Sequence, residues 1–187
     1  MSVTVQTAYN INTLKAYAGM LKDINDAQTV TGILADPDST AGSPAGIMVA
    51  YLDTPDGKDS VQFLDVSTFA PGGTAPPAGI VIHTHAADTI GLQTETSDIV
   101  FKQGASLSLL TKGIIYVTLD ASLTIVQGDP VYCRYSSNGG NTQLGAFSNA
   151  SDGGHNTLIR GAYFVESAAS GVVAAISFDI HAALTAL

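Results

Sequence analysis

The amino-acid sequence predicts an all-β fold, a jelly-roll-like antiparallel β-sandwich or barrel. Short runs rich in β-branched and aromatic residues recur along most of the chain, and Gly, Pro, Asn or Asp separates each run from the next. Helical periodicity occurs over one short stretch only, which argues against the alternating strands and helices of a parallel α/β fold. The 187 residues are enough for one globular domain.

Residues 1–24 are predicted to form an N-terminal arm with one short helix, and residues 25–187 the β-sandwich domain. Residues 1–11 alternate weakly between polar and apolar side chains, which is typical of an edge strand or of an arm that grips a neighbouring molecule. Asn12 and Thr13 could cap a helix, and the stripe that follows would pack on the chain's own sheet or on a partner. This stripe consists of Leu14, Tyr17, Ala18 and Leu21.

Short strands are predicted in succession from residue 29 to the C-terminus. Proline combined with Gly or Asp presets the turns between them, as at residues 36–38, 55–57 and 71–77. The last strand is the clearest, because the even-numbered residues from Val172 to Ile180 are all apolar. The predicted strands are 29–35, 46–52, 61–66, 79–85, 99–101, 106–110, 114–119, 131–135, 144–147, 158–165 and 172–180.

The segment from Gly113 to Tyr135 is the centre of the predicted sheet. Its two strand-like runs are separated by a polar break that ends in Gly-Asp-Pro at 128–130, a combination typical of turns. The first run is apolar on both faces, so a second layer is expected to cover it, either a part of the same chain or a neighbouring subunit. Ile114 and Tyr116 lie on one face, and Ile115, Val117 and Leu119 lie on the other.

The composition excludes several classes of partner. Formal net charge is −9, from 16 acidic against 7 scattered basic residues, so nucleic acid is not an expected partner. No apolar run is long enough to span a membrane, and no secretory signal is found at the N-terminus, so we expect synthesis and assembly in the cytoplasm. Only 12% of the residues are charged, which indicates a surface covered in part by another protein. Cys133 alternates with apolar residues and is expected to be buried.

His83 and His85 have the spacing of metal ligands, because residues i and i+2 of a strand share a face. This pattern is similar to the first motif of the cupins, a family of jelly-roll metalloenzymes. The glutamate expected after it is missing, since Thr89 and Ile90 stand at those positions. We therefore expect no metal, no cofactor and no catalytic residue, with a cupin-like metal-binding enzyme as the alternative hypothesis.

Several pieces of the sequence resemble one known family in the same order along the chain. They are Ala-Gly-Met-Leu at 18–21, the strand at 46–51, Gly-Ile-Val-Ile-His-Thr-His at 79–85, Lys-Gly at 112–113, Gly-Asp-Pro-Val-Tyr at 128–132 and Gln-Leu-Gly-Ala-Phe at 143–147. Each piece is short, but the ordered set spans nearly the whole chain. The set resembles the structural cement proteins that decorate the heads of tailed bacteriophages.

The resemblance implies a virion structural protein without enzymatic activity. Such a protein binds the outer surface of the capsid, between major capsid proteins, and stabilises the head against internal DNA pressure. A homotrimer is favoured, with a dimer as the second possibility, and a head-fibre or attachment module is an alternative role. The residues expected to contact the capsid or other subunits are Val5, Tyr9, Ile11, Tyr17, Met20 and Leu21.

Overall fold

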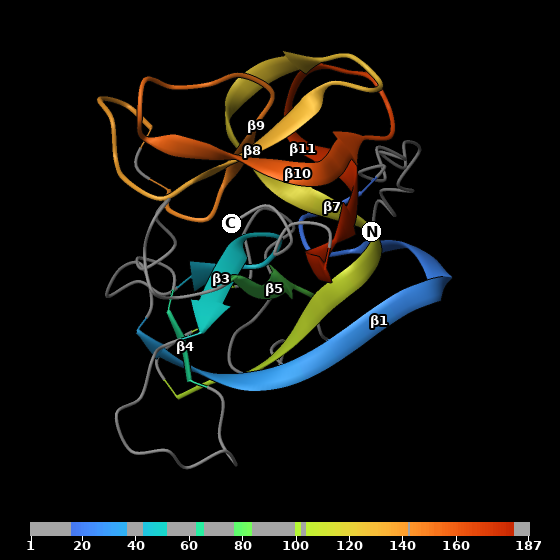
Figure 1. Cartoon of the computed structure of the whole chain (residues 1–187), viewed down its shortest axis with the longest axis vertical. Helices are drawn as coiled ribbons and strands as arrows, with labels where there is room; N and C mark the ends of the chain where they lie inside the picture. Colours follow the sequence, from blue (N-terminus) through green and yellow to red (C-terminus); the bar gives the residue numbers. More distant parts are fainter. Residues whose placement is uncertain are drawn as a thin grey trace, which may run out of the picture.

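The computed structural model describes residues 16–36, 43–51, 63–65, 77–83, 100–101, 104–141 and 143–181. The prediction of an all-β fold is confirmed (Figure 1), and within these ranges helical backbone occurs only in a turn at Ile180 and His181. The strands are β1 (Leu21–Asp36), β2 (Ser43–Pro44), β3 (Met48–Tyr51), β4 (Phe63–Asp65), β5 (Pro77–Val81), β6 (Val100–Phe101), β7 (Ser106–Ile125), β8 (Pro130–Arg134), β9 (Phe147–Ser148), β10 (Asn156–Phe164) and β11 (Ala168–Asp179).

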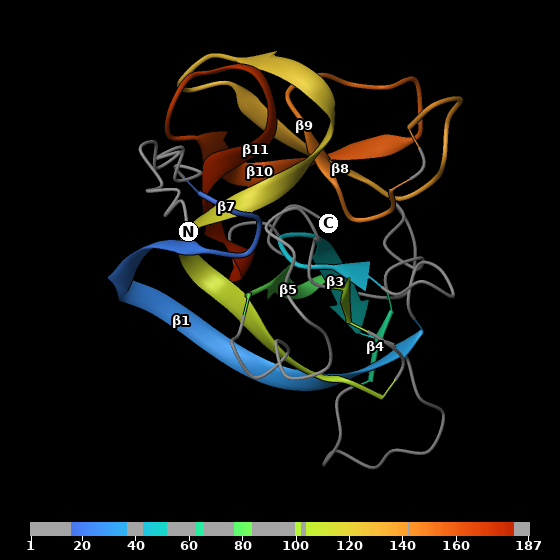
Figure 2. The same ribbon diagram turned by 180° about the vertical axis from the view of Figure 1, so that it is seen from behind.

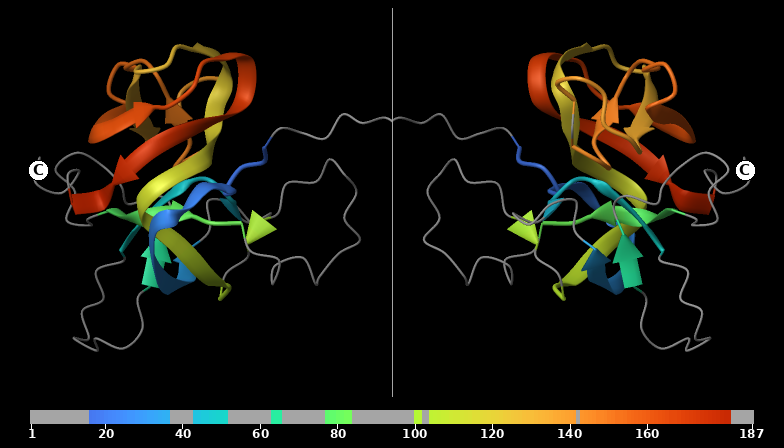
Figure 3. Two further views of the ribbon diagram at one scale, coloured as in Figure 1. Left: turned by 90° about the vertical axis from the view of Figure 1, so that its right-hand side faces the viewer. Right: turned by 90° about the vertical axis from the view of Figure 1, so that its left-hand side faces the viewer.

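The strands form two closed rings that share the long strand β7. One ring runs β1-β4-β3-β5-β7 and closes by pairing between β1 and β7, and the other runs β7-β11-β10-β8-β9 and closes by pairing between β7 and β9. Figures 1 and 3 show the rings as a lower and an upper lobe joined by β7. Most pairs are antiparallel, and β1–β4 and β7–β9 are parallel. Jelly-roll connectivity, with which this arrangement is compatible, stays a prediction.

The helix predicted over residues 14–21 is wrong for the part that the structure describes. Ala18 and Gly19 lie in a turn, and the chain is extended from the start of β1. Gly19 has a φ of 80°, its N–H donates to the carbonyl of Tyr116 at 2.7 Å, and its carbonyl accepts from the N–H of His83 at 2.9 Å. Backbone hydrogen bonds to distant strands thus outweigh the local helical pattern.

The sequence predicts two separate strands at 106–110 and 114–119, whereas the structure has the single strand β7 over both. The strand continues through Gly113, which has a φ of 137° and faces an irregular part of β1. There Asp23 pairs with Ile114 and Gln28 pairs with Lys112, so several residues of β1 bulge out opposite a single position of β7. A Cβ on Gly113 would lie 3.2 Å from the Cα of Ala27 in the bulge, so close approach of two strands requires the glycine.

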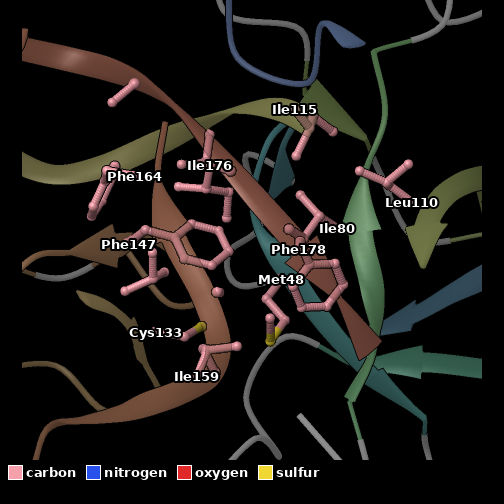
Figure 4. Close-up of a cluster of buried hydrophobic side chains, with 14 of the residues drawn as sticks. Met48, Ile80, Leu110, Ile115, Cys133, Phe147, Ile159, Phe164, Ile176 and Phe178 are labelled. Carbon is pink, nitrogen blue, oxygen red and sulfur yellow. The ribbon is translucent and has the colours of Figure 1, made fainter. Parts of the chain in front are cut away.

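Two clusters of buried side chains fill the two lobes. The upper cluster includes Phe147, Phe164 and Phe178, and it reaches Met48 and Ile80 from the lower ring (Figure 4). The lower cluster holds apolar residues of β1, β3, β5, β6 and β7. In the last strand the predicted inward face is confirmed, since its described members Ala174, Ile176, Phe178 and Ile180 are all buried.

The two apolar faces of β7 are both covered. Ile115, Val117 and Leu119 belong to the upper cluster, while Tyr116 on the other face is only 6% exposed. The ammonium group of Lys22 lies 5.7 Å from the centre of the Tyr116 ring. At this position the cover is therefore supplied by the same chain.

Candidate interaction surface

The residues that the sequence suggested as contacts are only partly available for binding. Leu21 is half-buried and packs against the upper core cluster, and Met20 is half-buried with its carbonyl bonded to the N–H of Tyr116 at 2.9 Å. Tyr17 is 41% exposed and can meet a partner. The other three predicted contacts, Val5, Tyr9 and Ile11, lie outside the described residues.

His83 has a packing role in this structure. Its ring lies against that of Tyr17, with ring centres 4.5 Å apart and the planes tilted by 59°. His85 lies outside the described residues, and within the described ones no group of three His, Cys, Asp or Glu side chains could hold a metal ion. This packing fixes Tyr17 at the point where the N-terminal segment joins the lower lobe.

A second apolar surface, which the sequence analysis missed, lies on strands β8 and β10. Leu158 pairs with Tyr132, and Tyr163 pairs with Pro130, with a register shift between the two pairs. Directly opposed residues of neighbouring strands share a face, so these four side chains lie on one side of the sheet. We call them the β8–β10 face.

The bulge in β10 creates this face. Leu158 and Tyr163 are five positions apart, and in a regular strand they would point to opposite sides. The register shift between them turns both side chains to the same side of the sheet. Gly161 lies within the shift and has a φ of 77°, a conformation that favours glycine. A glycine within a predicted strand was the one signal in the sequence that could have indicated the bulge.

The exposed fractions identify the β8–β10 face as an unusual surface. Leu158 is 46% exposed and Tyr163 is 49% exposed, and Val126, in the turn before β8, is 58% exposed. Arg160 is the one charged residue between the two exposed positions of β10, and it is itself exposed. Large apolar side chains gathered on one face of a soluble protein mark a binding site more often than scattered ones do.

The turn between β7 and β8 that borders this face is held by Asp129. The carboxylate of Asp129 accepts hydrogen bonds from the backbone N–H of Val126 at 2.9 Å and from the side-chain amide of Asn149 at 2.8 Å. The bond from Asn149 is the main reason why the pKa of Asp129 lies below its ordinary value. The predicted Gly-Asp-Pro turn is therefore confirmed, and its aspartate is a structural group.

Next to the face, Arg134 is buried in a cluster of carboxylates. Alternation along β8 places it on the outer side with Pro130 and Tyr132, yet its side chain is 1% exposed. Its guanidinium contacts Asp120 with more than one nitrogen, with Nε at 2.7 Å from both oxygens, and it donates to Asp152 at 2.6 Å. The hydrogen bonds to Asp120 raise the pKa of Arg134, and those to Asp152 lower the pKa of that carboxyl group.

The same cluster orders the long connections around β9. Asp152 also accepts from the side-chain amide of Asn138 at 2.9 Å, and its N–H donates to the side chain of Asn156 at 2.8 Å. Asn156 is buried and donates in turn to Ser148 and to the carbonyl of Ala150. The loops beside the β8–β10 face are thus rigidly connected to β7 and β8.

Cys133 is fully buried in the upper cluster, as predicted. Burial, followed by the nearby carboxylate of Asp120, raises the pKa of the thiol far above its ordinary value. A thiol in this state is a poor nucleophile.

A comparison with protein families identifies one family over most of the chain. Residues 5–179 match the model of the "structural cement protein (E217 gp24/Pam3 gp6)" family. The chain belongs to this family. The cement protein has no match among curated proteins.

A solved structure shares the fold of the cement protein. It is a chain from "The capsid of Myoviridae Phage XM1", with a TM-score of 0.59 and 16% sequence identity, and the alignment covers 92% of the cement protein and 98% of that chain. At this identity the likeness establishes the fold alone. The resemblance drawn from the sequence motifs is confirmed by the family match, and the protein is a structural component of a phage capsid. Within the described residues, no helix is long and apolar enough to cross a membrane.

Proposed function

We propose that the cement protein binds the outer surface of the phage head between major capsid proteins and stabilises the shell against internal DNA pressure. The observation that carries this proposal is the β8–β10 face, where Leu158 and Tyr163 are about half exposed on a rigid sheet. Binding would remove these side chains from water, and each contributes about 1.5–3 kcal/mol when it becomes fully buried. Half-exposed side chains contribute a fraction of that.

The net charge of the protein supports a position on the outer side of the shell. A net charge of −9 repels packaged DNA, so the inner surface of a filled head is an unfavourable place for this chain. The major capsid protein is therefore the proposed partner, and nucleic acid is not.

We further propose that the cement protein acts as an oligomer. A homotrimer at local three-fold positions is favoured, and a dimer that bridges two-fold positions is the alternative. Several copies joined together bind neighbouring sites on the lattice, and this raises the overall affinity without any new contact to the capsid. The N-terminal residues Val5, Tyr9 and Ile11, together with the exposed Tyr17, are proposed to contribute contacts in trans.

The turn at Gly19 supports a role for the N-terminal segment. A Cβ at this position would lie 2.6 Å from the backbone nitrogen of His83, and the φ of 80° is itself unfavourable for other residues. The segment therefore leaves the lower lobe from a fixed point. A fixed starting point lowers the entropy lost when the residues before it dock on a neighbour.

Binding to expanded empty heads tests the proposal. The purified protein is added to heads that lack it, and co-sedimentation measures how many copies bind per head. We expect wild-type protein to saturate the heads and to raise the temperature at which they break open. The double variant Leu158→Glu with Tyr163→Glu should lose binding, because two carboxylates would have to be buried against the capsid.

A matched control separates this loss from unfolding. Thr124→Glu places a carboxylate on an exposed position of β7 outside the β8–β10 face, and it should bind like wild type. All three proteins should unfold at similar urea concentrations, since exposed substitutions usually change stability by less than about 0.5 kcal/mol. Undiminished head binding by the double variant would remove the β8–β10 face from the proposal.

A further inference from the structure

Arg160 lies in the middle of the β8–β10 face. Leu158 and Arg160 are exposed and Ile159 between them is 3% exposed, so Arg160 points to the same side of the sheet as Leu158. The two cross-strand pairs of the face, which contain Leu158 and Tyr163, lie before and after it along the strands. Figures 1 and 2 show β10 beside β8 in the upper lobe from opposite directions. A partner that covers both pairs therefore also covers the guanidinium group between them.

Arg160 differs from the other basic residues that the structure describes. Acidic residues are in excess in this chain, and three of the four described basic residues form ion pairs within it. These pairs are Lys22 with Glu166 at 2.6 Å, Lys112 with Asp179 at 3.3 Å, and Arg134 with Asp120 and Asp152. Among the described residues, none forms an ion pair or a hydrogen bond with the guanidinium group of Arg160. This arginine is therefore available to a partner.

The β8–β10 face has no acidic side chain of its own. Its members are Pro, Tyr and Leu residues together with Arg160. Asp129 borders the face, but its carboxylate is bound to the N–H of Val126 and to the side-chain amide of Asn149. The face thus carries one positive charge in a protein whose net charge is −9. Pairing of two copies through this face would bring two arginines together without a carboxylate, so the face is not complementary to itself.

The energetic cost of covering Arg160 determines the chemistry of its partner. Removing a charged group from water is strongly unfavourable unless a counter-charge with good hydrogen-bond geometry replaces the water. The guanidinium group is planar, and its N–H groups match the two oxygens of a carboxylate. We propose that the surface of the major capsid protein that receives the β8–β10 face carries a carboxylate, and that Arg160 binds it through two parallel hydrogen bonds. This inference rests on the proposed function and states the chemistry of the capsid site.

The other side chains of the face fit the same arrangement. Tyr and Arg are enriched among the residues that contribute most to protein interfaces, and apolar contacts around them exclude water. Leu158 and Tyr163 lie on either side of the guanidinium group and would keep water from its pair with the carboxylate, which strengthens the pair. A phosphate group also matches a guanidinium group, but the net charge of −9 opposes binding to nucleic acid. The proposed capsid site is thus an apolar patch with one acidic residue at its centre.

Arg160→Met tests the ion pair through binding to expanded empty heads. Methionine keeps an unbranched apolar side chain but removes the charge, so the capsid carboxylate would be buried without a partner. The affinity for heads, measured by co-sedimentation, should fall about thirtyfold or more. A capsid site without a carboxylate would bind the variant as tightly as wild type or more tightly, and that result would overturn the proposal.

Lys112→Met is the matched control. It makes the same change in net charge, and Lys112 lies on β7 outside the face, in an exposed ion pair with Asp179. This variant should bind heads like wild type, and both variants should keep the wild-type circular dichroism spectrum. An equal loss of binding in both would show that net charge, and not a contact at Arg160, governs binding, and the proposal would fail.

A zero-length crosslink identifies the group that position 160 meets. Arg160→Lys keeps the positive charge and places a primary amine there. On heads that carry this variant, a carbodiimide activates carboxylates, and the amine displaces the activating group to form an amide bond. Mass spectrometry should find position 160 joined to an Asp or Glu of the major capsid protein. A head-bound variant that crosslinks from this position only to other copies of the cement protein, or to no carboxylate, would contradict the inference.

The outcomes separate this inference from the proposed function. Wild-type protein that does not bind heads overturns the proposed function itself. Wild-type protein that binds heads, together with an Arg160→Met variant of equal or higher affinity, overturns the capsid carboxylate alone. Binding to a fluorescent DNA duplex, followed by anisotropy, should be absent at physiological salt. DNA binding that Arg160→Met abolishes would assign the arginine to phosphate and overturn the carboxylate.

Discussion

Removal of the buried guanidinium of Arg134 is expected to be among the most destabilising single changes in the upper lobe. The Arg134 side chain is 1% exposed, and its main partner Asp120 is 4% exposed. In Arg134→Met the methionine can fill much of the space, but Asp120 keeps a carboxylate in the interior without its cation. Breaking a buried pair in this way costs about 3–5 kcal/mol.

The second carboxylate adds little to this figure. The side chain of Asp152 is 30% exposed, so water screens it when the guanidinium is lost, and exposed pairs contribute about 0–1 kcal/mol. The expected loss is therefore set by Asp120. It is a large part of the roughly 5–15 kcal/mol of free energy of unfolding that a domain of this kind has.

Urea denaturation followed by circular dichroism measures the loss. The midpoint should fall with an unchanged slope, which shows that the unfolded and native states expose the same surface as before. The double variant Asp120→Leu with Arg134→Met should recover much of the stability, because no charge then remains buried without a partner. Arg160→Met is the control, since Arg160 is an exposed arginine on β10.

Two outcomes would refute the reasoning. A loss of less than about 1 kcal/mol in Arg134→Met would mean that Asp120 reaches water easily. A double variant that is less stable than Arg134→Met would mean that the packing of the two side chains, and not the unpaired charge, decides the stability.

Three further changes have defined outcomes. The carboxyl groups of Asp129 and Asp152 have lower pKa values in the folded protein than in the unfolded chain. Their contribution to the free energy of unfolding is therefore complete above about pH 4 and is lost as the pH falls through the folded pKa values. Urea midpoints measured over a pH series should drop on the acidic side, and they should drop less steeply in Arg134→Met. Phe147→Ala should lower the free energy of unfolding by about 3–5 kcal/mol, because this fully buried ring lies where β9 closes the upper ring, and an unchanged urea midpoint would contradict that packing. Gly145→Ala should lower the melting temperature, because the new Cβ would lie 2.5 Å from the carbonyl oxygen of Met48 and Gly145 has a φ of 76°. Gly140→Ala is the control, because a Cβ at that position would lie in open space. Equal effects of the two substitutions would count against the close approach of Gly145 to Met48.

The sequence alone determined the features that depend on neighbouring residues. The period of two in the last strand, the Gly-Asp-Pro turn before β8 and the burial of Cys133 all follow from local alternation and turn chemistry, and each agrees with the structure. The ordered motifs also led to the cement family, which the family match confirms. These features depend on residues that are consecutive or close in the sequence, so they can be predicted without knowing which distant residues they contact.

The tertiary structure decided the features that depend on partners far along the chain. The turn at Gly19 replaces a predicted helix because its hydrogen bonds reach Tyr116 and His83, and β7 continues through Gly113 because a bulge of β1 lies against it. The β8–β10 face exists because a register shift turns Leu158 and Tyr163 to the same side. An amphipathic pattern in the sequence indicates which side chains are buried. Which of these side chains contact one another depends on the register between strands, and that register is fixed only when the two rings close on β7.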